Sequence, residues 1–96
     1  MSHEERLFLS LPRYPAYVDL QESCWFLGLK LHEGRILVAA GELKPSGKNG
    51  PRKAKKFATA YILELVDDRA WLGTARDTIT RHWEKLNKHK TKKHKQ

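Results

Sequence analysis

The feature that most constrains the fold is the stretch from residue 19 to residue 43, where two short apolar patterns flank a glycine. Small or apolar residues recur at helical spacing in its first half, at Leu20, Ser23, Cys24 and Leu27. This spacing predicts a helix over about residues 20–27 with one buried face. Asp19 can accept hydrogen bonds from the free N–H groups at its start. Gly28 can end it in the left-handed conformation.

A second short helix is predicted directly after the first, over about residues 31–40, and Gly41 ends it. Its apolar residues are Ile36, Leu37 and Ala40. Gly34 falls inside this helix and costs roughly 1 kcal/mol relative to alanine. Two short helices around a Gly-containing turn of about three or four residues are typical of a helix-turn-helix. The stretch is therefore interpreted as a DNA-reading unit.

The distribution of charge indicates the kind of partner. The chain has 96 residues, which is room for one small domain, and a formal net charge of +8. Residues 44–57 carry six basic and no acidic side chains, and residues 81–96 carry seven basic and one acidic. Concentrated positive charge is typical of proteins that bind a polyanion. The alternative is solubility alone, although solubilising charge is usually mixed in sign.

The segments around the two helices divide the chain further. Residues 1–17 are expected to form an N-terminal arm, in which residues 1–11 form one helical turn or a strand docked on the core. Residues 18–66 form the domain itself. Asn49-Gly50 predicts a hairpin tip between short strands near residues 43–44 and 55–57.

Two more helices are predicted towards the C-terminus. Thr59 is expected to cap a helix that ends near Val66, and Asp67-Asp68 to mark a break and a fresh cap. Residues 67–87 then form a C-terminal helix that packs on the domain or on a partner; its apolar residues recur at steps of three and four. Residues 88–96 have no apolar side chain and are expected to be a disordered basic tail.

The order of these residues resembles the winged helix-turn-helix domain of phage-type excisionases and of the related MerR-type regulators. The residues that carry the resemblance are Leu27-Gly28, the run Ala39-Ala40-Gly41-Glu42-Leu43-Lys44-Pro45, Lys56-Phe57 and Thr59. It covers about residues 18–66. It implies a mainly α fold with a small β-hairpin, a winged helix-turn-helix with four helices. In that fold the second helix enters the DNA major groove, and the hairpin wing touches the adjacent backbone or minor groove.

The resemblance also implies partners and roles. Excisionases of this kind bend DNA beside a recombinase, and their relatives regulate transcription. The expected partner is double-stranded DNA, with a recombinase as a further partner. A second copy of the chain, bound through the C-terminal helix, is also considered. Two positions depart from the family pattern. Lys30 stands where Ser or Thr often caps the second helix, and Gly34 stands near a usually apolar position.

The candidate DNA-binding residues are the cationic and polar side chains of the second helix and of the wing. They are Lys30, His32, Arg35, Lys48, Asn49, Arg52, Lys53, Lys55 and Lys56. Lys and Arg neutralise phosphates and release counterions. Arg35 is the best candidate for a bidentate contact to a guanine edge. The alternative for each residue alone is a solvated surface charge.

Catalysis, metals and cofactors are not expected. The chain has no Gly-rich phosphate loop, and its acidic residues are dispersed. Cys24 has no evident histidine partner, so a buried structural cysteine is favoured over a reactive thiol. His82, His89 and His94 have no ligand cysteine or carboxylate cluster nearby. No segment has the length and apolarity of a membrane span or a secretory signal, so a cytoplasmic location is expected.

Two other functions are compatible with the same sequence. A protein-interaction adaptor on this fold would use the C-terminal helix, through Trp71 and Trp83, to pair with a second copy or a partner. An RNA-binding or ribosome-binding protein would use the basic tail. Complete packing of the C-terminal helix on its own domain would remove the reason for the adaptor.

Overall fold

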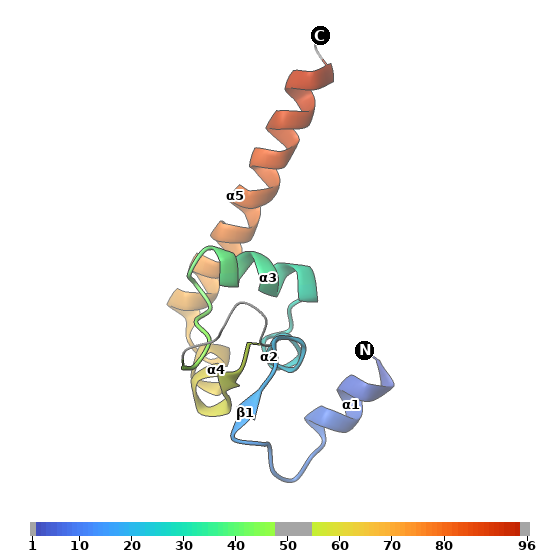
Figure 1. The fold of residues 1–96 in the computed structure, drawn as a ribbon, viewed down its shortest axis with the longest axis vertical. Coiled ribbons are helices and arrows are strands. Elements are labelled where there is room, and N and C mark those ends of the chain that lie inside the picture. The colour runs from blue at the N-terminus through green and yellow to red at the C-terminus, as the bar shows by residue number, and fades with distance from the viewer. Residues whose placement is uncertain (1, 48–54, 95–96) are drawn as a thin grey trace.

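The computed structural model describes residues 2–47 and 55–94, which form five helices and two short strands (Figure 1). The helices are α1 (His3–Leu9), α2 (Leu20–Leu27), α3 (Leu31–Ala39), α4 (Thr59–Val66) and α5 (Arg69–His94). The strands are β1 (Tyr17–Val18) and β2 (Phe57–Ala58). The protein is therefore mainly helical with a small antiparallel sheet. The expected number of four helices is wrong for the described chain, because the N-terminal arm contributes α1.

The N-terminal arm is attached to the rest of the protein through aromatic rings. The Ser2 hydroxyl accepts a hydrogen bond from the Glu5 N–H at the start of α1. Phe8, the buried residue of α1, lies 5.3 Å from Phe26 and 5.6 Å from Trp25 between ring centroids. Tyr14 stacks on Phe8, and its hydroxyl donates to the Leu9 carbonyl. Of the two expected forms of the arm, the structure shows the helix.

The two central helices begin and end where the sequence predicted. Asp19 accepts the Glu22 N–H, and the Glu22 carboxylate accepts the Asp19 N–H, so α2 starts with a capping box. Gly28 ends α2 with φ of 71°. Lys30 has no acceptor atom in its side chain; instead, the Glu33 carboxylate accepts the Lys30 N–H at 2.9 Å. A reach-back bond from the first turn therefore replaces the usual hydroxyl cap of α3.

The antiparallel sheet joins segments that are distant in the sequence. Tyr17 lies opposite Ala58, and Val18 lies opposite Phe57. The expected strand near residues 43–44 is wrong, because the partner of the 57–58 strand is β1. Pro45 has no N–H to donate to a strand ladder. Leu43 is instead fully buried in the core.

A second set of hydrogen bonds holds residues 44–47 beside β2 and α4. The Ser46 N–H donates to the Lys56 carbonyl at 2.8 Å, and the Ser46 hydroxyl accepts the Ala58 N–H at 3.1 Å. The Lys44 N–H donates to the Tyr61 hydroxyl. The described ends of the basic segment are therefore tied together through one serine.

The core lies between the sheet and the helices. Its fully buried hydrophobic residues are Val18, Cys24, Leu37, Leu43, Phe57 and Ile62. Ala75 and Ile79 of α5 extend this core, so the first half of α5 belongs to the domain. Thr59 is not the cap of α4, as predicted, but its first residue. Its hydroxyl donates to the Pro15 carbonyl and ties α4 to the chain before β1.

The long C-terminal helix starts on the domain and projects from it. The Asp68 carboxylate accepts the Trp71 N–H at 3.0 Å, which confirms the predicted fresh cap. The distal half of α5 extends away from the other helices (Figure 1). The helix continues to His94, whereas the sequence predicted disorder from residue 88. Residues 88–94 contain no glycine or proline, and lysine is a good helix former, so the helix is not interrupted there.

Candidate nucleic-acid interface

Helix α3 has one face in the core and another open to solvent. Gly34 and Leu37 are buried, whereas His32 and Arg35 are exposed. Lys30, just before the helix, is also exposed. All three predicted residues of this helix therefore reach solvent. They lie just before the helix and in its first half, which is the part of a DNA-reading helix that contacts base edges.

Helix α5 packs across α3 with the two chains running in opposite senses, and two contacts define this arrangement (Figure 1). The Trp71 indole N–H, near the start of α5, donates to the Glu42 carbonyl just after α3, at 2.8 Å. Further along α5, the Trp83 ring meets the His32 ring near the start of α3, with centroids 5.8 Å apart and planes at 73°. The N-terminal turn of α3 therefore lies beside the part of α5 that begins to project.

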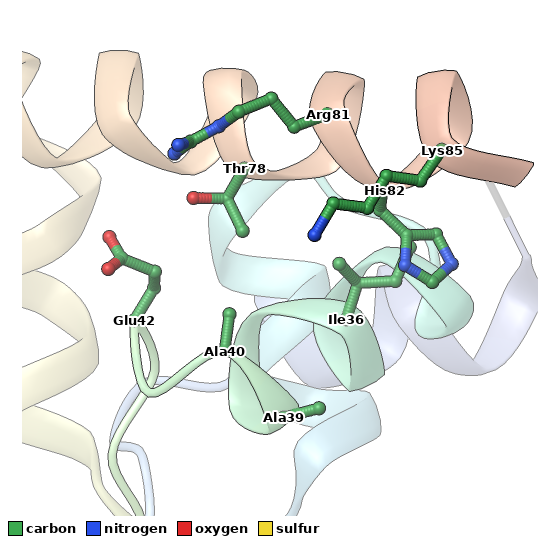
Figure 2. A pocket seen from close by; sticks show the side chains of 8 residues that line it. All are labelled: Ile36, Ala39, Ala40, Glu42, Thr78, Arg81, His82 and Lys85. Atoms are coloured by element: carbon green, nitrogen blue, oxygen red, sulfur yellow. The ribbon is translucent and has the colours of Figure 1, made fainter. Parts of the chain in front are cut away.

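A groove of about 540 Å³ lies between α3 and α5 (Figure 2). Short aliphatic side chains line it from α3 and its end, and longer polar side chains line it from α5. The lining residues are Ile36, Ala39, Ala40, Glu42, Thr78, Arg81, His82 and Lys85. Figure 2 shows the Lys85 side chain extending over the groove from α5 and the Glu42 carboxylate at one end. The Arg81 side chain lies along α5 at the edge of the groove, and its Nε–H donates to the Asp77 carbonyl of the same helix at 3.4 Å. The groove therefore combines an apolar floor with a cationic wall.

Arg81 and Lys85 were not among the predicted site residues. The sequence placed them in a basic C-terminal block without a position relative to α3. Their spacing of four residues puts them on one face of a helix, and Thr78 lies three residues before Arg81 on the same face. That spacing can be recognised in the sequence. The packing of α5 on α3, which places these side chains beside the groove, cannot be predicted from the sequence alone.

The predicted wing residues are described only in part. Lys48, Asn49, Arg52 and Lys53 lie outside the described residues. Lys55 and Lys56 are exposed and come directly before β2. Within the described chain no hydrogen bond joins either lysine to α3. The structure therefore brings Lys30, His32 and Arg35 together on α3 and positions Lys55 and Lys56 beside the sheet.

Cys24 is set up as a structural residue. Its side chain is fully buried, and burial raises the pKa of the thiol from 9.0 to about 11. Because the thiolate is the nucleophile, a raised pKa suppresses reactivity at neutral pH.

Among the described residues, no group of three or more His, Cys, Asp and Glu side chains is placed to hold a metal ion. None of the helices described has the length and apolarity needed to cross a membrane.

Comparison with protein-family models, with curated proteins and with solved structures found no match. The function is therefore inferred from the geometry of α3, of the groove and of the basic segment.

Proposed function

We propose that the protein binds double-stranded DNA as a winged helix-turn-helix, with α3 in the major groove. The observation that carries the proposal is the arrangement of α2 and α3. They are joined by a tight turn that begins at Gly28 in the left-handed conformation. This turn buries one face of α3 and leaves Lys30, His32 and Arg35 exposed at its N-terminal end. Helices that read the major groove present their N-terminal residues in this way.

The geometry of residues 44–47 and 55–57, the described parts of the segment that follows α3, supports the proposal that this segment forms the wing. Ser46 ties its two described ends together, so the chain leaves and returns at neighbouring positions. The described cations of the segment, Lys44, Lys55 and Lys56, are exposed. Lysines on such a hairpin would contact the phosphate backbone beside the site that α3 reads. The proposed biological role is that of an excisionase-like or transcriptional regulatory factor.

The test is fluorescence anisotropy with a labelled DNA duplex over a series of salt concentrations. We expect the logarithm of the binding constant to fall linearly with the logarithm of salt concentration. Replacing both Lys55 and Lys56 with alanine should reduce that slope by about 1.8, because each phosphate contact contributes about 0.9. Competitor double-stranded RNA should displace the labelled DNA poorly. An absence of binding at low salt, or stronger displacement by RNA than by unlabelled DNA, would reject the proposal.

A second candidate function, protein-interaction adaptor, is favoured by one observation. Trp83 and Leu86 keep 42% and 43% of their surfaces exposed on the projecting part of α5. Trp71, by contrast, packs on its own domain and donates to Glu42. The seven basic residues of the 81–96 segment would repel the same segment of a second copy. An acidic partner therefore fits this surface better than self-association, and sedimentation should show a monomer at tens of micromolar.

A further inference from the structure

The lining of the α3–α5 groove matches the chemistry of a nucleic-acid backbone. A sugar–phosphate strand alternates a largely apolar sugar with an anionic phosphate. The groove offers short aliphatic side chains from Ile36, Ala39 and Ala40 below the cationic side chains of Arg81 and Lys85 (Figure 2). We propose that this groove seats one backbone strand of the duplex that α3 reads, with Arg81 and Lys85 contacting its phosphates. This inference rests on the proposed function.

The position of α5 suits a strand that borders the major groove. Packed helices lie with their axes about 8–10 Å apart, and the major groove of B-DNA is about 12 Å wide. A helix inserted in that groove has a backbone strand on each side of it, so the side chains of a helix packed against it can reach one of those strands. Because α5 contacts α3 through Trp83 and His32, its side chains lie at this flank.

The cations are arranged in a row along the groove. Arg81 and Lys85 are four residues apart, which corresponds to about 6 Å along the helix axis on one face. Lys88 follows three residues later and is exposed, so it continues the row beyond the groove. On the opposite side, Arg35 precedes the lining residue Ala39 by four residues and therefore shares its face of α3. The groove is thus bordered by cations from both helices.

The charge of the lining limits which occupants are compatible with it. Glu42 is the one acidic residue among those that line the groove, and it lies at one end. A second copy of the chain would bring more positive charge to a positive wall. A phosphate strand supplies the opposite charge along the whole row.

The experiment compares two double variants that each remove two positive charges from α5. Arg81→Gln with Lys85→Gln changes the groove, whereas Arg69→Gln with Arg76→Gln changes exposed residues that do not line it. Duplex binding by the full chain is measured over the same salt series. We expect the groove variant to reduce the salt slope by about 1.8, and the matched control to leave it nearly unchanged. Glu42→Gln should strengthen binding severalfold.

The outcomes separate this inference from the proposed function. Equal slopes for the two double variants, with a wild-type protein that binds duplex DNA, would overturn the groove assignment alone. A wild-type protein that does not bind the duplex would overturn both. Poly-glutamate binding that depends on Arg81 and Lys85, with duplex binding independent of them, would assign the groove to an acidic protein segment and also overturn the inference. Circular dichroism of all three variants is the control that each retains the helical fold.

Discussion

Gly34 of α3 lies directly against the sulfur atom of Cys24 in α2. A β-carbon at Gly34 would come 2.4 Å from Cys24 Sγ and 3.2 Å from Leu20 Cδ1. Separations under 3.0 Å do not occur between such atoms without a shift of one of them. The glycine therefore allows α3 to approach α2 closely, and its cost as a helix residue is offset by this packing.

Replacing Gly34 with alanine should lower the free energy of unfolding by about 1 kcal/mol, because overpacking outweighs the gain in helix propensity. The same replacement in a Cys24→Ala background should be neutral or stabilising, since the sulfur atom is gone. Urea denaturation of the four proteins in this double-mutant cycle measures the coupling. Equal effects of Gly34→Ala in the two backgrounds would show that the contact does not limit the approach of the helices.

The buried thiol of Cys24 should make stability depend on pH in the alkaline range. Its pKa is about 11 in the folded protein and 9.0 when unperturbed, so the unfolded chain loses this proton first. Stability from this residue is therefore present below pH 9 and is lost as the pH rises towards 11. The difference in the free energy of unfolding between the wild-type protein and Cys24→Ala should therefore shrink by roughly 2–3 kcal/mol between pH 9 and pH 11.

The same burial should protect the thiol from chemical modification. Ellman's reagent should react slowly with the folded protein at neutral pH and rapidly in concentrated urea. Comparable rates in the two conditions would contradict the assignment of Cys24 as a structural residue.

The bond from the Trp71 indole to the Glu42 carbonyl should be important for docking α5. Replacing Trp71 with phenylalanine keeps an aromatic ring but removes the hydrogen-bond donor. We therefore expect the free energy of unfolding to fall by about 1–2 kcal/mol. Trp83→Phe is the control, because it changes a ring that is partly exposed on the same helix. Thermal unfolding followed by circular dichroism compares them; a larger loss for Trp83→Phe would contradict this role of Trp71.

The Ser46 hydroxyl should stabilise the base of the basic segment. Ser46→Ala leaves the Ala58 N–H without this acceptor, which should cost about 1–3 kcal/mol. Ser10→Ala removes a hydroxyl that bonds within the N-terminal arm and serves as the control. If the wing binds DNA, Ser46→Ala should also weaken duplex binding, whereas Ser10→Ala should not. Identical unfolding curves for the two variants would argue against a role of Ser46 at this position.

Removing residues 88–96 should distinguish the role of the projecting end of α5 from that of the part of α5 that packs on the domain. Ala75 and Ile79 supply the buried contacts of α5, and both lie well before the cut. We therefore expect the melting temperature to change little, while the helical signal per molecule falls and duplex affinity decreases. A large fall in melting temperature would show that these residues stabilise the domain.

Local signals in the sequence predicted some helix ends correctly, namely the two ends of α2 and the start of α5. Asp19, Gly28 and Asp68 act through side chains or backbone angles within a few residues of themselves, so their roles can be read from a single stretch. The pairing of β1 with β2 could not be predicted in this way. Each strand has two residues, which is too short for a periodic pattern, and about forty residues separate them.

The candidate site shows the same division. Arg35 and its neighbours were identified because a helix pattern places them on an open face. Arg81 and Lys85 were missed because their role depends on the contact of α5 with α3, which involves Trp83 and His32. Similarly, Gly34 could be recognised as costly in a helix, but its contact with Cys24 is a tertiary feature.

The last turns of α5 extend past the apolar stripe and carry almost entirely positive charge. Cations three and four residues apart on a helix repel one another, and a nearby polyanion would neutralise that repulsion. We therefore predict that a polyanion lying alongside this segment increases its helicity, which a spectroscopic label near residue 90 would report as a gain in local order.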